Sequence, residues 1–135
     1  MYRTSIQLRV RYGETDRMGY AYYGNYAEYF EVARVEALRE LGMSYRKMED
    51  EGVLLPVLDY SVKYIKPAYY DDLLKIVVMI TELPTARLKF EYEVYNENEN
   101  LITKANTTLV FIDAKLNKPL AAPKEFLSVL EPYFS

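Results

Sequence analysis

Residues 25–42, NYAEYFEVARVEALRELG, carry the apolar periodicity that decides the fold. Apolar side chains recur here at steps of three and four residues, the spacing that one face of an α-helix requires. They are Tyr26, Tyr29, Phe30, Ala33, Ala37, Leu38 and Leu41. Asn25 is a candidate N-cap and Gly42 a candidate C-terminal stop. The stretch therefore predicts one amphipathic helix of about 16 residues.

Alternating strand patterns lie on both sides of this helix. Before it, residues 4–12 place Ile6, Leu8, Val10 and Tyr12 on one face and Gln7, Arg9 and Arg11 on the other. After it, residues 44–51 form a short helical stretch that ends at Gly52. The later strands are predicted at 54–65 (in broken pieces), 73–83, 88–94 and 101–112, with a short C-terminal helix within 123–134.

This order of elements predicts an α+β fold with a five-stranded antiparallel sheet, because the strands that follow the helix are joined by short turns. The 135 residues suit a single domain that spans residues 1–135. One helix covers only one face of such a sheet. The 15 Tyr residues suit half-buried sheet and interface positions. We therefore expect the remaining apolar surface to be covered by a second copy, in a homo-oligomer.

The amino-acid composition limits the kinds of catalytic site, metal site and partner that this chain can have. The chain has no His and no Cys, which excludes a Cys nucleophile, a Ser-His-Asp triad, a His base and a Cys/His zinc site. The net charge of −3 and the lack of a basic block disfavour duplex nucleic acid as a partner. No run of 18 apolar residues and no signal-peptide core are present, so we expect a cytoplasmic protein without membrane insertion.

The loop between the first strand and the helix contains the best candidate for chemistry. Asp16 and Gly19 precede the helix start, where unpaired backbone N–H groups and a partial positive charge can polarise a carbonyl. A carboxylate at this place could attack that carbonyl or activate water against it. The alternative is structural, since Asp-x-x-Gly before a helix is often a turn in which Asp binds local N–H groups.

The longer stretch 12–34, YGETDRMGYAYYGNYAEYFEVAR, resembles the signature of the 4-hydroxybenzoyl-CoA thioesterase family. It is especially similar to the acyl-CoA thioesterase branch associated with the Tol-Pal system. That signature has Asp, two residues, Gly, an apolar-aromatic stretch, an aromatic-rich helix start and then Phe-Glu-x-Ala-Arg. The resemblance continues in 64–72 (YIKPAYYDD) and 107–113 (TTLVFID), and so covers nearly the whole chain.

The resemblance implies a hot-dog fold, in which a long central helix is wrapped by a five-stranded antiparallel sheet. It also implies homodimers that often pair into tetramers, active sites at the dimer interface, and hydrolysis of acyl-CoA without a metal or cofactor. The catalytic carboxylate falls on Asp16, as nucleophile or general base, and the loop glycine on Gly19. The N–H that polarises the thioester carbonyl falls on Tyr23. The Tol-Pal-associated branch commonly has His at the position of Tyr23, so its substrate preference does not carry over.

Several further residues are candidates for substrate binding. Tyr26 belongs to the aromatic-rich helix start, and Asn25 could order water or substrate instead of capping the helix. Glu31 could approach the site of a partner subunit, or pair with Arg34 on its own helix. The remaining candidates are cations that could meet the CoA phosphates or be solvated surface charges, namely Lys63, Lys66, Arg87 and Lys89.

The leading prediction is therefore an acyl-CoA thioesterase that releases free acid and CoA. The alternative is a non-catalytic hot-dog protein that binds acyl-CoA, with Asp16 only a turn residue. A hot-dog dehydratase is a third possibility, but that chemistry in the superfamily usually relies on a His that this chain lacks.

Overall fold

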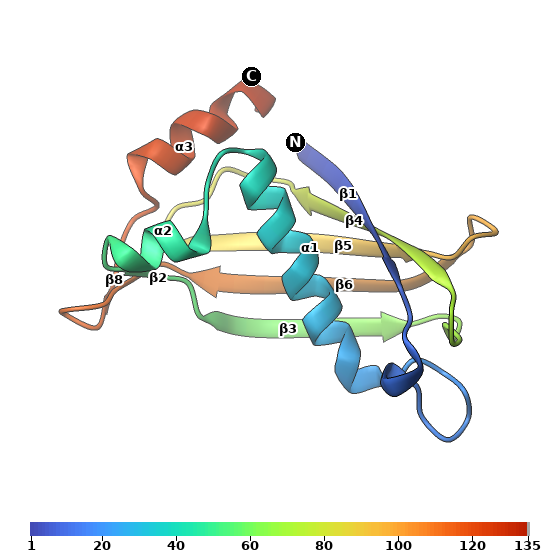
Figure 1. The fold of residues 1–135 in the computed structure, drawn as a ribbon. Helices are drawn as coiled ribbons and strands as arrows, with labels where there is room; N and C mark the ends of the chain where they lie inside the picture. The colour runs from blue at the N-terminus through green and yellow to red at the C-terminus, as the bar shows by residue number, and fades with distance from the viewer. Residues whose placement is uncertain (135) are drawn as a thin grey trace.

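The main sheet is built by five strands in which apolar and polar residues largely alternate. The computed structural model describes residues 1–134. The strands are β1 (Tyr2–Arg9), β3 (Val57–Tyr64), β4 (Leu73–Ile80), β5 (Arg87–Tyr95) and β6 (Leu101–Val110). Their order in space is β1-β4-β5-β6-β3, and every neighbouring pair is antiparallel (Figure 1). The predicted α+β class and five-stranded antiparallel sheet are confirmed.

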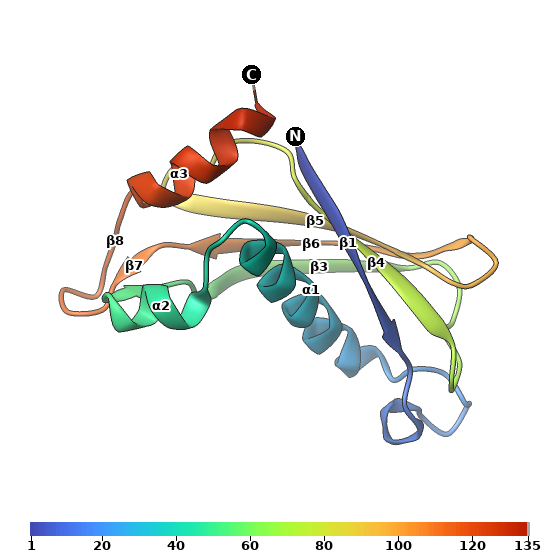
Figure 2. The ribbon, with the colours of Figure 1, turned by 45° about the horizontal axis from the view of Figure 1, so that its top comes forward.

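The predicted long helix is α1 (Tyr26–Glu40), and it crosses one face of this sheet (Figures 1 and 2). Its predicted apolar stripe is buried: Tyr26, Tyr29, Phe30, Ala33, Ala37 and Leu38 lie in the core, and Leu41 is packed against it. The ring centroid of Phe30 lies 4.5 Å from that of Tyr92 on β5. The helix therefore seals the inner face of the sheet with aromatic and aliphatic contacts.

The helix ends at Glu40, and Gly42 provides the predicted stop just beyond it. Gly42 has φ +84°, a conformation that suits glycine because it carries no Cβ. Its N–H donates to the carbonyl of Arg39 (2.9 Å), and the N–H of Met43 donates to that of Leu38 (2.8 Å). This pair of bonds is a Schellman motif, which satisfies two of the last carbonyls of the helix.

The remaining elements are short and lie mostly at one end of the main sheet. The predicted helix at 44–51 is α2 (Tyr45–Asp50), and the predicted C-terminal helix is α3 (Lys124–Leu130) followed by a 3-10 turn over Glu131–Tyr133. A second sheet, of order β2-β7-β8, consists of β2 (Val53–Leu54), β7 (Ile112–Asp113) and β8 (Lys118–Pro119). Figure 1 shows α2 beside this small sheet.

Four predicted strands have wrong boundaries. The predicted strand 101–112 is divided between β6 and β7, which belong to different sheets. The first strand ends at Arg9 and not at residue 12, because the chain turns into a 3-10 helix over Tyr12–Glu14. Tyr12 is consequently 78% exposed instead of facing inward. The predicted strand 54–65 is divided between two sheets, β2 and β3, and β4 ends at Ile80, three residues before the predicted end.

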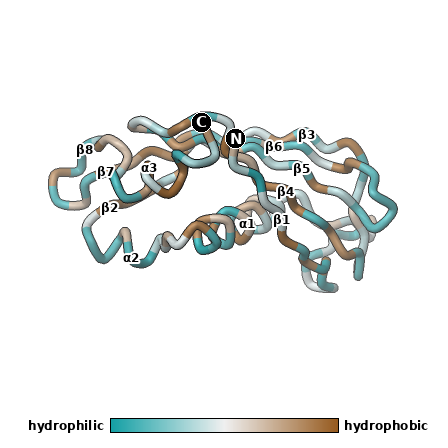
Figure 3. Tube along the Cα trace, turned by 90° about the horizontal axis from the view of Figure 1, so that it is seen from above, coloured by the Kyte–Doolittle hydropathy of each residue, from teal (hydrophilic) through white to brown (hydrophobic). Residues whose placement is uncertain are grey.

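The strand β3 forms one edge of the main sheet and pairs only with β6 among the residues described. Five large apolar side chains in or next to it stay exposed, namely Val57, Leu58, Tyr60, Tyr64 and Ile65. Figure 3 shows hydrophobic residues distributed along α1 and the main sheet. Within residues 1–134, no helix is long and apolar enough to span a membrane.

Candidate active site

The loop between β1 and α1 is a tight hairpin that holds Asp16 at its turn. Its two arms meet in a bridge between Thr15 and Ala21. The turn closes through the Asp16 N–H, which donates to the Tyr20 carbonyl (2.8 Å), and the Gly19 N–H, which donates to the Asp16 carbonyl (3.0 Å). Gly19 has φ +82°, and no atom lies within 4 Å of where its Cβ would stand. Gly19 therefore serves the backbone turn and not a close contact.

The Asp16 carboxylate is held by the same turn. Its Oδ1 accepts hydrogen bonds from the N–H groups of Met18 (2.9 Å) and Tyr20 (3.1 Å). Asp16 is thus a turn residue, as the structural alternative holds. Its Oδ2 receives no hydrogen bond from residues 1–134, and the half-buried side chain lines a cavity. Two backbone donors therefore fix the carboxylate while leaving one oxygen without a protein partner.

The helical segment begins earlier than predicted, with a 3-10 turn over Tyr23–Asn25 that runs directly into α1. The first N–H groups of a helix have no acceptor within it. Accordingly, no backbone carbonyl in the described part of the chain accepts from Tyr23 or Gly24. The start of the helix carries a partial positive charge, so these N–H groups are suited to hold a carbonyl oxygen.

One cavity of about 300 Å³ brings Asp16 and Tyr23 together. Its other walls are Met18, Tyr20, Ala21, Tyr26, Tyr64, Ile65, Lys66 and Pro67. The ring of Tyr64 packs edge-on against Tyr26, with 5.2 Å between the centroids, and its hydroxyl donates to the Tyr23 carbonyl (3.3 Å). Burial raises the pKa of Tyr26 and of Tyr64, so both hydroxyls stay protonated near neutral pH.

Asn25 does not cap the helix. Its backbone is already helical (φ −77°, ψ −19°), and its side chain makes no capping hydrogen bond. The side-chain Nδ2 donates instead to the carbonyl of Glu14 (2.7 Å). Asn25 stands at the predicted position directly before Tyr26, but the predicted capping hydrogen bond is not formed, because the 3-10 turn over Tyr23–Asn25 runs directly into α1. Asn25 is also not among the residues that line the Asp16 cavity.

Glu31 and Arg34 line a second cavity, of about 510 Å³, together with Tyr60 of β3. No ion pair joins Glu31 to Arg34 within residues 1–134. Arg34 is buried, and its Nε has no hydrogen-bond partner there. Although burial acts to lower it, the neighbouring phenols of Tyr92 and Tyr45 raise the pKa of Arg34. The predicted pairing of these two residues is thus not formed.

The four candidate cations are spread over the molecule. Lys66 lines the cavity that contains Asp16. Lys89 is exposed on β5 between the buried Leu88 and Phe90, and Lys63 is exposed on β3 next to Val62, which packs against the core. Arg87 begins β5 at the end of the sheet remote from Asp16. In the part of the chain described, no group of three or more acidic side chains could hold a metal ion.

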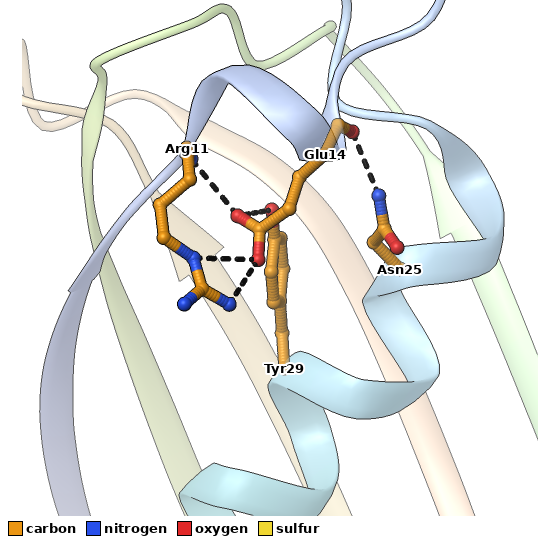
Figure 4. A network of polar contacts seen from close by, with 4 residues as sticks. All are labelled: Arg11, Glu14, Asn25 and Tyr29. Carbon is orange, nitrogen blue, oxygen red and sulfur yellow. Dashed lines mark hydrogen bonds and ion pairs between the residues drawn. The ribbon is translucent and has the colours of Figure 1, made fainter.

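Sequence reasoning missed Glu14, which joins the Asp16 loop to the helix (Figure 4). Its Oε1 accepts from the Arg11 N–H (2.9 Å) and the Tyr29 hydroxyl (3.0 Å), and its Oε2 accepts from the Arg11 guanidinium (2.7 and 3.1 Å). Against the effect of burial, the hydrogen bonds from Arg11 and Tyr29 hold the pKa of Glu14 below its ordinary value. The spacing of Arg11 and Glu14, opposite charges three residues apart, was the signal that could have found it.

Comparison with known proteins identifies the family. Residues 10–130 match the Thioesterase-like superfamily, so the chain belongs to this superfamily. The resemblance found in the sequence is thereby confirmed.

Individual relatives cover almost all of the chain. The putative acyl-CoA thioesterase YneP of Bacillus subtilis (strain 168) is 33% identical over 126 residues, which are 93% of this chain and 91% of the relative. The acyl-CoA thioester hydrolase YbgC of Escherichia coli O157:H7 is 33% identical over 90% of each chain. Among solved structures, a DHNA-CoA thioesterase from Staphylococcus aureus is 36% identical, with a TM-score of 0.86 over 99% of this chain and 85% of the other.

Proposed function

We propose that this protein hydrolyses acyl-CoA thioesters to a free carboxylic acid and CoA, with Asp16 as the reacting carboxylate and the Tyr23 N–H polarising the thioester carbonyl. The observation that carries the proposal is that Asp16 and Tyr23 line the same cavity. Membership of the Thioesterase-like superfamily and the printed activities of YneP and YbgC support the class of reaction.

Two routes are open to the Asp16 carboxylate. As nucleophile, its free oxygen attacks the thioester carbon, CoA leaves as the thiolate, and water then hydrolyses the acyl-aspartyl anhydride. As general base, Asp16 takes a proton from the water that attacks the carbon, and that proton ends on the departing thiolate. In both routes negative charge develops on the carbonyl oxygen. The Tyr23 N–H, at the positive end of the helix, stabilises that charge.

The same cavity offers contacts for the rest of the substrate. The buried ring of Tyr26 and the ring of Tyr64 provide an aromatic wall for the group next to the thioester. Lys66 supplies a cation at the cavity for the polar arm of CoA. Gly19 contributes the turn that directs the Asp16 carboxylate.

We further propose that the protein works as a homodimer, paired through β3, and that two dimers join into a tetramer. The exposed edge and apolar side chains of β3 favour addition of a second copy in antiparallel register. Such pairing brings the Val57 end of one strand next to the Tyr64 end of the other. Arg87 lies toward the Val57 end of its own sheet, so the dimer brings it toward the partner's cavity.

The other sequence candidates depend on this second copy. Glu31 lies in the cavity beside β3, at the proposed interface. Lys63 and Lys89 are on the outer face of the sheet, where they would act as cations for CoA phosphates only near the partner's site. Asn25 acts on the loop through Glu14 rather than on the substrate.

The Asp16→Asn variant tests the proposal. The side-chain amide keeps an oxygen that can accept from the N–H groups of Met18 and Tyr20, so the hairpin should remain folded. The amide cannot act as nucleophile or base. We expect thiol release from a panel of aliphatic and aromatic acyl-CoAs to fall by about 10²- to 10⁴-fold in kcat, with an unchanged circular dichroism spectrum.

Two outcomes would overturn the proposal. Equal rates for wild type and Asp16→Asn would remove Asp16 from the mechanism. Binding of acyl-CoA by the wild type, without thiol release from any member of the panel, would leave a non-catalytic acyl-CoA-binding protein.

A further inference from the structure

We infer that Glu14 is a positioning residue for the hydrolysis, because it holds the Asp16 loop against the start of the helix and so fixes Asp16 relative to the Tyr23 N–H. Glu14 is two residues from Asp16 in sequence. Its carboxylate and its backbone carbonyl both accept hydrogen bonds from the helical segment. The inference rests on the proposed roles of Asp16 and Tyr23.

The side chain of Glu14 forms the first of two links. Its carboxylate accepts the hydroxyl of Tyr29, which is on the first turn of α1 and is 4% exposed. The Arg11 N–H and guanidinium hold the same carboxylate from the end of β1. Since Tyr29 is buried in the core, this link ties the loop to the packed first turn of the helix (Figure 4).

The backbone of Glu14 forms the second link. Its carbonyl accepts the N–H of Tyr22 (2.8 Å) and the side-chain Nδ2 of Asn25 (2.7 Å). These two donors flank Tyr23 in sequence, one residue before and two residues after. Glu14 therefore holds the segment that presents the Tyr23 N–H from both sides, while its own chain leads directly to Asp16.

Glu14 lies behind the site and not in it. It is absent from the lining of the Asp16 cavity and instead borders a separate cavity of about 220 Å³, shared with Arg11, Glu28 and Tyr29. Its side chain is only 13% exposed. A substrate in the Asp16 cavity meets other side chains, so Glu14 acts through the geometry of its neighbours.

This arrangement predicts a specific kinetic signature. Loss of the side-chain link lets the carboxylate and the N–H drift apart, and a misplacement of about 1 Å can cost about 10²-fold in rate. The walls that bind the substrate, such as Tyr64 and Lys66, are not touched by Glu14. The effect should therefore fall on kcat and leave KM nearly unchanged.

The test compares Glu14→Ala, Glu14→Gln and Tyr29→Phe with wild type, using the best acyl-CoA of the panel. We expect Glu14→Ala to lower kcat by about 10- to 100-fold with KM within about twofold. Glu14→Gln keeps a side-chain acceptor for Tyr29 and should recover most of the loss. Tyr29→Phe removes a single hydroxyl from the link and should lower kcat by about 3- to 10-fold; it carries the test if Glu14→Ala does not fold.

Thr4→Val is the matched control. The Thr4 hydroxyl donates to Glu40 (2.6 Å) and so joins β1 to the far end of the same helix. This variant should keep the wild-type kcat. The inference is overturned if Glu14→Ala and Tyr29→Phe keep wild-type kcat, or if Thr4→Val loses as much. An inactive Asp16→Asn alongside active Glu14 variants would overturn only this inference, whereas an active Asp16→Asn would overturn the proposed function.

Discussion

At the residue scale, the turn that holds Asp16 is compatible with the proposed catalytic role of the same side chain. The N–H groups of Met18 and Tyr20 bind one carboxylate oxygen and thereby fix the orientation of the other. A carboxylate that is already oriented needs little free energy for reorganisation when the substrate reacts. The turn that made a purely structural interpretation reasonable is thus also what a reactive Asp16 requires.

The pH dependence of stability should reveal the Glu14 network. The pKa of Glu14 is lowered in the folded chain, so the unfolded chain binds more protons between the folded and the ordinary value of about 4.3. The stabilisation is complete above that ordinary value and is lost as the pH falls through the lower folded value. We expect wild type to exceed Glu14→Gln by about 1–2 kcal/mol at pH 7.

Urea unfolding of both proteins at pH 7, 5, 4 and 3 measures this difference. It should shrink below about pH 4.3, as Glu14 of the wild type becomes protonated. Tyr29, whose pKa is raised by burial and by Glu14, stays protonated throughout, and Arg11 stays charged. Glu28 borders the same cavity in both proteins and cancels in the comparison. A difference that is constant from pH 7 to pH 3 would contradict the assigned network.

At the element scale, α1 was the part of the fold most open to prediction from sequence. Its buried stripe and its stop at Gly42 follow from local periodicity and from the backbone freedom of one glycine. The 3-10 turn over Tyr23–Asn25 that precedes α1 was not predicted, because this turn is stabilised by Glu14, eleven residues before Asn25. A local pattern cannot report that contact, so Asn25 was assigned to a cap that the structure does not form.

The core face of α1 should carry most of its stability. Phe30 is fully buried and contacts Tyr92, Tyr60 and Tyr26 by its ring. Phe30→Ala should cost about 3–5 kcal/mol in the free energy of unfolding, from lost burial and the cavity left behind. Val32 lies on the outer face of the same helix and is 45% exposed, so Val32→Ala should change the free energy of unfolding by less than about 0.5 kcal/mol. Denaturant melts that gave the two variants similar losses would contradict this division of the helix.

The strands illustrate a second limit of sequence reasoning. Alternation identifies the buried faces of β5 and β6, because side-chain direction in a strand has a period of two. It did not tell which end of the sheet a residue occupies. Of the four candidate cations the sequence favoured Arg87, in the turn-like segment before a strand, as the phosphate contact, yet it is Lys66 that shares a cavity with Asp16 within one described chain. That distinction requires the strand order β1-β4-β5-β6-β3, which depends on contacts far apart in sequence.

At the scale of the whole molecule, the two edges of the main sheet are not equivalent. β1 closes one edge and is linked to α1, since the Tyr2 hydroxyl donates to the Ala37 carbonyl (3.1 Å). β3 closes the other edge with exposed apolar side chains beside the Asp16 cavity, to which Tyr64 and Ile65 contribute. An open apolar edge invites pairing with another strand, so a dimer through β3 would complete both the sheet and the site.

The Leu58→Lys substitution should therefore both dissociate the proposed β3 dimer and abolish its thioesterase activity. Leu58 is 54% exposed on β3, and a charge on an edge strand opposes edge-to-edge pairing. We expect wild type to sediment at twice the chain mass of 15.9 kDa or at a higher multiple, and the variant to shift toward the monomer. Thiol release per chain should fall in parallel. Leu116→Lys changes an equally apolar side chain, 67% exposed, in the hairpin between β7 and β8 and so outside the β3 edge, and should alter neither mass nor activity. An active Leu58→Lys monomer would show that one chain completes the site alone.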